Sequence, residues 1–148
     1  MEAQPDFRDL LALFNAHKVD YIIVGAYALA YHGAPRYTGD IDILVRPDLE
    51  NVQHILCALK EFGFGSLGLR VEDFAVTDRV VQLGVAPVQI DIVTSITGVS
   101  WEEATAEQKA GYYGDTSVQY IGRKQFVKNK YMIGRKKDLA DLETIGEK

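Results

Sequence analysis

Two aspartates lie one residue apart in a segment that otherwise has the composition of a buried β-strand. Asp40 and Asp42 belong to the segment Asp40–Val45, in which the other four residues are aliphatic. Residues two apart on a strand point to the same face, about 7 Å from each other. Two carboxylates placed in this way repel each other and are costly to desolvate. A divalent cation between them would remove both costs, and Mg²⁺ binds carboxylate oxygens while keeping coordination positions for phosphates.

A third aspartate has similar neighbours. Asp91 lies in Val88–Val93, a second segment that predicts an apolar strand. If the two strands pair side by side, three carboxylates converge, and two Mg²⁺ ions about 4 Å apart could neutralise them and assist a phosphoryl displacement. An Asp-x-Asp pattern is also common without a metal. In that alternative Asp42 pairs with Arg46 or Arg36 and the other acids have structural roles, and spacing alone leaves both interpretations open.

A glycine follows the strand that precedes the aspartate pair. The β-branched residues Ile22, Ile23 and Val24 lead directly to Gly25, and a short helix is expected over Ala26–Tyr31. Backbone N–H groups at a strand-to-helix turn favour a phosphate, and glycine permits its close approach. Tight packing between strand and helix is the alternative explanation for Gly25.

A longer pattern surrounds these residues. The chain reads HG-x-x-R-x-T-x-D-x-D before the second strand and K-D-x-x-D-L near its end, with a further lysine upstream of the latter. Over about residues 6–145 it resembles the polymerase-beta-type nucleotidyltransferase superfamily, and more closely its small bacterial members akin to abortive-infection nucleotidyltransferase toxins. The matching residues are Gly25, Ala26, His32, Gly33, Arg36, Thr38, Asp40, Asp42, Asp91, Lys130 and the segment Lys137–Leu142.

The resemblance implies a nucleotidyltransferase that uses two Mg²⁺ ions and takes a nucleoside triphosphate (NTP) as substrate. The catalytic and metal-binding residues that it implies are Asp40, Asp42 and Asp91. The nucleotide-binding residues that it implies are Gly25, Ala26, Arg36, Thr38 and Lys130. The supporting residues that it implies are Lys137 and Asp138.

One position departs from the pattern. Ala26 stands where the family usually has glycine or serine. Alanine keeps the backbone N–H but has no hydroxyl to offer a triphosphate. The alternative function is therefore a catalytically silent nucleotide-binding or interaction module of the same fold, and metal-dependent phosphohydrolysis is a weaker third hypothesis.

The expected reaction moves a nucleoside monophosphate (NMP) group from an NTP to a hydroxyl of an RNA, a protein or a small molecule. The toxin branch of the family implies a tRNA or protein acceptor and a partner antitoxin, and the small size of the chain suggests a homodimer or another complex. Seven basic residues lie within residues 123–137 and could receive an RNA.

Composition sets wider limits. The chain has 148 residues, enough for one domain with a hydrophobic core, and its net charge of −5 argues against general nucleic-acid binding. Cys57 is the single cysteine, so an internal disulfide is excluded. Neither a signal peptide nor a membrane span is apparent, and we expect a cytoplasmic protein without membrane contact.

The order of predicted elements indicates an α/β (α+β) fold with a mixed sheet of about four to five strands and helices packed on it. We expect one domain over residues 1–148, with a core at about 6–122 and a C-terminal helical segment at about 123–146. Strands are expected at 20–24, 40–45, 79–83, 88–93 and 118–121. Helices are expected at 6–18, 26–31, 48–62, 101–109, 124–131 and 136–145.

Overall fold

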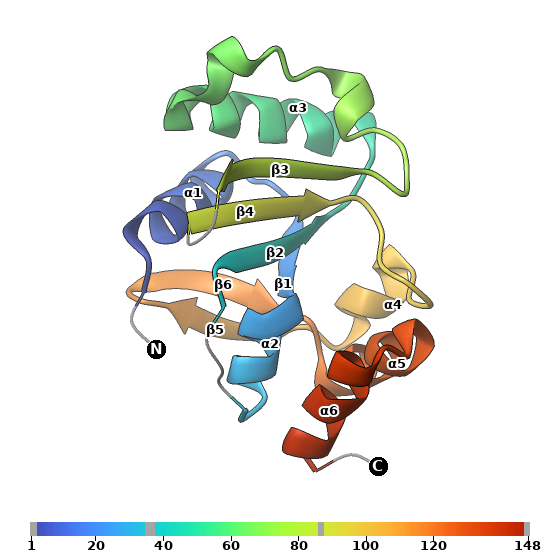
Figure 1. The fold of residues 1–148 in the computed structure, drawn as a ribbon. Coiled ribbons are helices and arrows are strands. Elements are labelled where there is room, and N and C mark those ends of the chain that lie inside the picture. Colours follow the sequence, from blue (N-terminus) through green and yellow to red (C-terminus); the bar gives the residue numbers. More distant parts are fainter. Residues whose placement is uncertain (1–2, 35–37, 86–87, 147–148) are drawn as a thin grey trace.

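The computed structural model describes residues 3–34, 38–85 and 88–146, and within them six strands form one mixed sheet (Figure 1). The strands are β1 (Tyr21–Val24), β2 (Asp40–Val45), β3 (Val80–Val85), β4 (Val88–Val93), β5 (Lys109–Tyr113) and β6 (Thr116–Tyr120). The α-helices are α1 (Pro5–Ala16), α2 (Gly25–Tyr31), α3 (Leu49–Leu59), α4 (Trp101–Ala106), α5 (Arg123–Ile133) and α6 (Lys136–Thr144). The expected α+β class is confirmed.

The strand order is β3-β4-β2-β1-β6-β5. At its centre β2 runs antiparallel to β1 and parallel to β4, whereas β1 runs parallel to β6. The hairpins β3–β4 and β5–β6 complete the two edges. This order puts the strand that carries Asp91 directly beside the strand that carries Asp40 and Asp42, which is the arrangement that the sequence required for convergence of the three acids.

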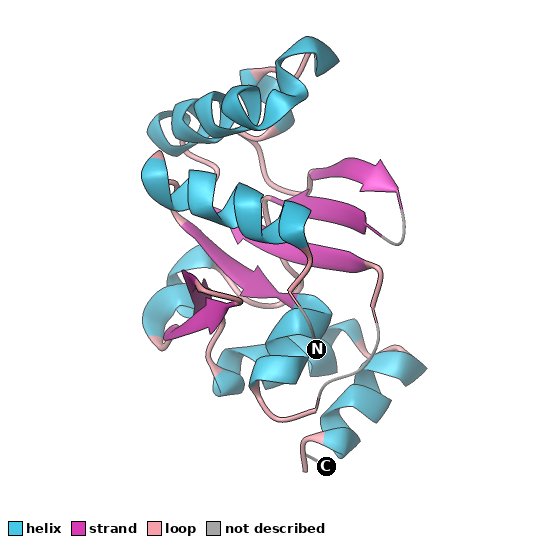
Figure 2. Ribbon diagram, turned by 90° about the vertical axis from the view of Figure 1, so that its left-hand side faces the viewer, coloured by secondary structure: helices cyan, strands magenta, loops and turns pink. Residues whose placement is uncertain are grey.

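Helices α1 and α3 pack together on one side of the sheet (Figure 2). Helix α1 buries Phe7, Leu10, Leu11 and Phe14 there. Side chains alternate along β2, so Ile41 and Ile43 are fully buried in this core while Asp40 and Asp42 face the other side. Helices α2, α5 and α6 lie at the lower end of the molecule in Figure 1, next to that acid-bearing side of the sheet.

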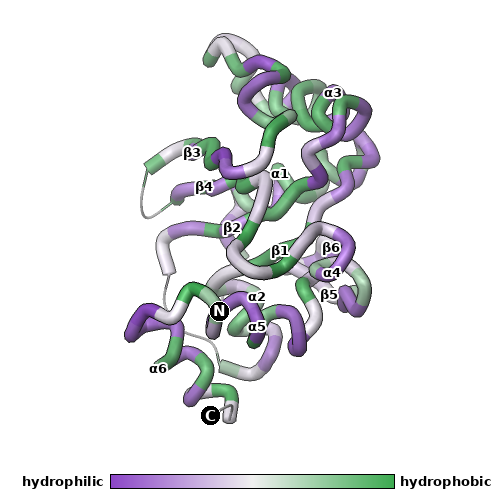
Figure 3. Tube along the Cα trace, turned by 90° about the vertical axis from the view of Figure 1, so that its right-hand side faces the viewer, coloured by the Kyte–Doolittle hydropathy of each residue, from purple (hydrophilic) through white to green (hydrophobic). Residues whose placement is uncertain are grey.

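Local sequence signals account for four of the helix ends. Pro5 occupies the first turn of α1, and the Asp48 side chain caps α3 by accepting a hydrogen bond from the Asn51 backbone N–H. Ser100 caps α4, since its Oγ accepts from the Glu103 N–H. Helix α5 ends at Gly134, whose φ of +70° suits glycine. Figure 3 shows hydrophilic and hydrophobic stretches following one another along the chain at the end of the molecule that carries α2, α5 and α6.

The structure corrects two boundaries. The helix expected to run to Lys109 ends at Ala106, and Lys109–Tyr113 forms β5, so the sheet has six strands instead of four to five. The missed signal was the Gly114-Asp115 turn, because two residues of this type between two strands predict a tight hairpin. The helix expected to run to about Phe62 leaves α-geometry after Leu59 and continues as a π-type turn.

Among the described residues, no helix is long and apolar enough to cross a bilayer.

One buried amide connects the start of α3 to the sheet. Asn51 is 1% exposed. Its Oδ1 accepts from the Asp20 N–H at 2.7 Å, and its Nδ2 donates to the Asp20 and Arg46 carbonyl oxygens at 3.0 and 2.8 Å. These bonds fix the end of β2 next to the start of β1, and thereby hold the antiparallel pair on which the acids depend.

We therefore expect Asn51→Ala to lower the free energy of unfolding by roughly 2–4 kcal/mol, because three partly buried hydrogen bonds to the backbone are lost. Urea denaturation measures the change. Gln53→Ala, an exposed position on the same helix, is the matched control and should stay within about 0.5 kcal/mol of the wild type. Equal stability of the two variants would show that Asn51 does not join α3 to the sheet in the way described.

Candidate functional site

Strand register brings the three aspartates together. In the parallel pair β2–β4, Asp42 lies opposite Asp91, and Asp40 lies opposite Gln89. One carboxylate oxygen from each of Asp40, Asp42 and Asp91 lies within 4.8 Å of the others. The convergence expected from the sequence is therefore observed, and all three oxygens lie within the span that one or two small cations can bridge.

Gly25 packs directly against this cluster. Its predecessor Val24 pairs with Asp42 across β1–β2, and Gly25 turns the chain into α2 with a φ of +67°. A Cβ on Gly25 would lie 2.9 Å from the Asp42 Cγ and would overlap its carboxylate oxygen. Tight packing is thus a role of this glycine, here against a candidate metal ligand, and the close approach of a phosphate stays a prediction.

The three carboxylates destabilise one another electrostatically. Burial raises the pKa of Asp42 to about 7, with further increases from the charges of Asp40 and Asp91 and a partial decrease from Lys130. Burial also raises the pKa of Asp91, although a hydrogen bond from Gln89 opposes that shift. Carboxylates this close cannot all ionise cheaply without a counter-charge. A bound cation would supply that counter-charge.

Neighbouring side chains orient two of the acids. Thr38 Oγ1 donates to Asp40 Oδ1 at 2.9 Å, and Gln89 Nε2 donates to Asp91 Oδ1 at 2.9 Å. The alternative in which Arg46 neutralises Asp42 is wrong, because the Arg46 guanidinium pairs with Asp20 and Asp48 at the other end of β2. Arg36 lies outside the described residues.

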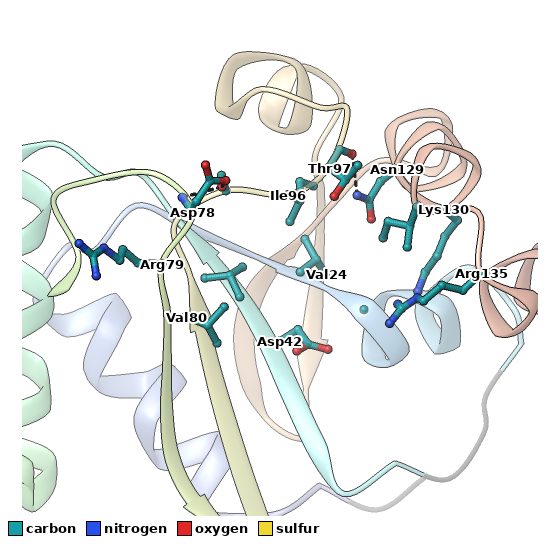
Figure 4. A pocket seen from close by; sticks show the side chains of 14 residues that line it. Val24, Asp42, Asp78, Arg79, Val80, Ile96, Thr97, Asn129, Lys130 and Arg135 are labelled. Atoms are coloured by element: carbon teal, nitrogen blue, oxygen red, sulfur yellow. Dashed lines mark hydrogen bonds between the residues drawn. The ribbon is translucent and has the colours of Figure 1, made fainter.

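A cavity of about 440 Å³ opens beside Asp42 (Figure 4). Three groups of residues line it: the Gly25 turn, the segments around the ends of β3 and β4, and helix α5 with the residue that precedes α6. The lining residues are Val24, Gly25, Asp42, Asp78, Arg79, Val80, Val93, Ser95, Ile96, Thr97, Asn129, Lys130, Ile133 and Arg135. The volume falls within the range of small-molecule sites, about 300–1,000 Å³.

Lys130 carries a buried positive charge into this cavity. It is 6% exposed, and its Nζ lies 3.2 Å from Asp138 Oδ1 and 3.7 Å from Asp141 Oδ2. Arg135 Nε donates to the second oxygen of Asp138 at 2.6 Å. Burial pushes the pKa of Asp138 upward, but the hydrogen bonds from Arg135 and Lys130 outweigh that effect and hold the pKa below its usual range. The ion pairs therefore fix Lys130 at the cavity wall.

The other predicted residues have simpler surroundings. Ala26 is buried in the first turn of α2 and Lys137 is exposed on α6, outside the cavity lining. His32 Nε2 donates to the Ile121 carbonyl oxygen at 2.8 Å, which ties the end of α2 to the end of β6. That contact gives His32 a structural role.

Sequence reasoning missed four residues around the site. Gln89 orients Asp91, Arg135 holds Asp138, and Asn129 and Asp78 line the cavity. Gln89 could have been found, since it lies two residues before Asp91 and therefore on the same strand face. The positions of the other three depend on how α5 and β3 pack, which no local pattern reports.

Comparison with known proteins identifies the fold. The chain matches no protein-family model and no curated protein. A candidate nucleotidyltransferase from Thermotoga maritima has a similar structure, with a TM-score of 0.64 at 17% identity over 95% of this chain and 92% of that one. An antigenic nucleotidyltransferase-like protein from Paracoccidioides brasiliensis gives a TM-score of 0.57 at 14% identity over 97% and 75% of the two chains. This chain therefore has a nucleotidyltransferase-like fold.

The contact between Gly25 and Asp42 predicts the effect of one added methyl group. Gly25→Ala should lower the free energy of unfolding by roughly 3–5 kcal/mol, from backbone strain together with overlap, and should weaken Mg²⁺ binding at least about tenfold because Asp42 is displaced. Denaturation and calorimetric Mg²⁺ titration measure the two effects.

Gly33→Ala is the matched control, since Gly33 also has a positive φ (+112°) but an added Cβ would meet nothing within 4 Å. It should lose stability through strain alone and keep the Mg²⁺ affinity of the wild type. Equal Mg²⁺ affinity in both variants would contradict the proposed link between Gly25 and the cluster.

Burial of Asp42 also predicts a pH dependence in the absence of metal. The pKa of Asp42 is about 7 in the folded protein and 3.8 in the unfolded chain. Between these two values the folded protein keeps a proton that the unfolded chain has lost. The free energy of unfolding therefore falls as pH rises from ~4 to ~7. With chelator present, Asp42→Asn should therefore gain roughly 3–6 °C in Tm over the wild type at pH 8 and little at pH 4. A difference in Tm that does not change with pH would contradict this account of the cluster.

Proposed function

We propose that this protein is a Mg²⁺-dependent nucleotidyltransferase that moves an NMP group from an NTP to an acceptor hydroxyl. The observation that carries the proposal is the meeting of three carboxylates from two strands, one of which, Asp42, lines a cavity that a buried lysine also lines. The nucleotidyltransferase-like fold supports the same reaction class. Fold alone would not suffice, because function depends on the site that a fold carries.

The residues present fit a hard divalent cation. Asp40, Asp42 and Asp91 offer only oxygen ligands, and their closest oxygens lie within 4.8 Å of one another. Burial and the neighbouring carboxylates raise the pKa of Asp42, and a divalent cation held there would offset both effects. Two Mg²⁺ ions held by these acids would withdraw charge from the α-phosphate and from the leaving pyrophosphate.

The chain's own residues would position the reaction. The acceptor oxygen forms a bond to the α-phosphorus while the bond to the bridging oxygen of the β-phosphate breaks, and pyrophosphate leaves. Asp91, on the strand next to Asp42, would orient the acceptor hydroxyl and receive its proton. Lys130 would bind a phosphate oxygen of the triphosphate, and the backbone at Gly25 and Ala26 would contact it closely.

The remaining predicted residues would act indirectly. Thr38 would hold Asp40 through the hydrogen bond at 2.9 Å. Asp138 would anchor Lys130. Lys137 would contribute positive charge at the start of α6, and Arg36 is proposed as a phosphate contact from the sequence resemblance alone.

The acceptor is proposed to be a tRNA or a protein, with an antitoxin or a second copy of the chain as partner.

The basic segment at residues 123–137 offers fewer accessible positive charges than its sequence suggests. Lys128 pairs with Glu103 at 2.7 Å, Lys130 is buried, and Arg135 is bound to Asp138. An RNA acceptor would therefore meet mainly Lys124, Lys136 and Lys137.

Ala26 favours a second candidate function, a nucleotide-binding module without transferase activity. Ala26 is buried, with 7% of its surface exposed, and its side chain has no hydrogen-bonding group. This position therefore offers a phosphate only its backbone N–H. Mg-ATP binding without NMP transfer would support this second function.

Asp42→Asn and Asp91→Asn should each lower NMP transfer at least about 10³-fold while the circular dichroism spectrum stays that of the wild type, because each removes a charged ligand but keeps its shape. The measurement is transfer of label from α-labelled NTPs to acceptors in cell lysate. Asp115→Asn, in the exposed turn between β5 and β6, is the control and should retain full transfer. Full activity of Asp42→Asn would refute the proposed mechanism.

A further inference from the structure

The cavity extends from Asp42 to helix α5. Away from Asp42, both apolar and polar side chains form its wall, among them Ile96, Ile133 and Asn129 of α5. Apolar side chains together with a few fixed polar groups are typical of sites that enclose a flat organic group and read its edge.

Asn129 is held in one orientation. It is 7% exposed, and its Nδ2 donates to the Thr97 carbonyl oxygen at 2.8 Å (Figure 4). Only the nitrogen of an amide can donate to a carbonyl, so this bond leaves Oδ1 as the free end of the amide. Within the described ranges, no residue donates to Asn129 Oδ1. The cavity wall therefore includes a hydrogen-bond acceptor whose direction is fixed by the bond from Asn129 Nδ2 to the backbone.

The neighbouring residue on the helix indicates how a nucleotide would lie. Lys130 follows Asn129 directly and lines the same cavity from the same helix. In the view of Figure 4, Lys130 extends toward Arg135, whereas the Asn129 amide lies beside Thr97, on the opposite side of the cavity from Asp42. A ligand with phosphates near Lys130 and Asp42 would thus bring its base to Asn129.

We infer that Asn129 selects the nucleobase of the NTP by accepting a hydrogen bond from an exocyclic amino group. The inference rests on the proposed function. It predicts preference for the 6-amino group of adenine or the 4-amino group of cytosine over a carbonyl oxygen at the same position. A carbonyl there would face Oδ1 as a second acceptor, and turning the amide to suit it would break the bond to Thr97.

The surroundings favour a base over a ribose hydroxyl as the donor. Ile96 and Ile133 line the same cavity and offer apolar contacts to the faces of a base, which a ribose diol would not use. The test must still separate the two donors, because Oδ1 could accept from either.

The experiment measures binding, not catalysis. The full chain is titrated calorimetrically with ATP, ITP, CTP and UTP in the presence of Mg²⁺. ITP replaces the 6-amino group of ATP by a carbonyl, and UTP replaces the 4-amino group of CTP. We expect the amino-bearing member of at least one pair to bind about tenfold or more tightly than its carbonyl counterpart, since the mismatch leaves buried acceptors unpaired.

Asn129→Leu should reduce that ratio to within about twofold, mainly by weakening the amino-bearing nucleotide, because leucine keeps the volume but has no acceptor. Gln125→Met is the matched control: Gln125 is a buried amide one turn earlier on α5 that bonds Glu107 and does not line the cavity. It should preserve the wild-type ratio. The wild-type ratios stand as a test by themselves if Asn129→Leu does not fold.

Two results would overturn the inference alone. One is equal affinity within both nucleotide pairs in the wild type. The other is a wild type that binds ATP more tightly than 2′-deoxy-ATP but binds ATP and ITP equally, together with loss of the 2′-deoxy-ATP discrimination in Asn129→Leu. That result would assign Asn129 to the ribose. Failure of all four nucleotides to bind would instead refute the proposed function together with this inference.

Discussion

Mutual repulsion of Asp40, Asp42 and Asp91 is the constraint around which this end of the sheet is arranged. The hydrogen-bond ladder between β2 and β4 keeps Asp42 opposite Asp91, so the strands cannot separate their charges without losing their pairing. Gly25 has no Cβ, so the Asp42 carboxyl can lie directly against the turn after β1, where an added Cβ would overlap it. The fold therefore maintains a concentration of negative charge that favours a cation, and the raised pKa of Asp42 is its electrostatic consequence.

The C-terminal helices supply the opposite charge across the cavity. Lys130 on α5 is fixed by Asp138 and Asp141 on α6, and Arg135 completes the network. Burying such a network is costly unless its members are well paired. Here the pairing joins two helices and presents one ammonium group to the cavity, so the packing of α5 on α6 and the chemistry of the site depend on the same contacts. A ligand with negative charge could lie between this ammonium group and a cation held by the three aspartates.

Much of the site follows from local patterns in the sequence. The two-residue period of a strand predicts that Asp40 and Asp42 share a face, and the glycine after β1 predicts a close approach. The missed strand β5 contains alanine and glycine, which have low strand propensity, and it forms because β6 offers a hairpin partner. Asn129 has the sequence context of an ordinary helix residue. Its fixed amide results from the Thr97 carbonyl, which arrives from a loop 32 residues earlier.

The central claim is that the three aspartates bind a divalent cation, and anomalous diffraction from crystals grown with Mn²⁺ tests it most directly. Mn²⁺ shares the oxygen preference of Mg²⁺ and scatters anomalously. The account predicts a peak within about 2.0–2.3 Å of an oxygen from each of Asp40, Asp42 and Asp91. Peaks confined to other sites, or carboxylates that point apart around an empty centre at saturating Mn²⁺, would contradict it.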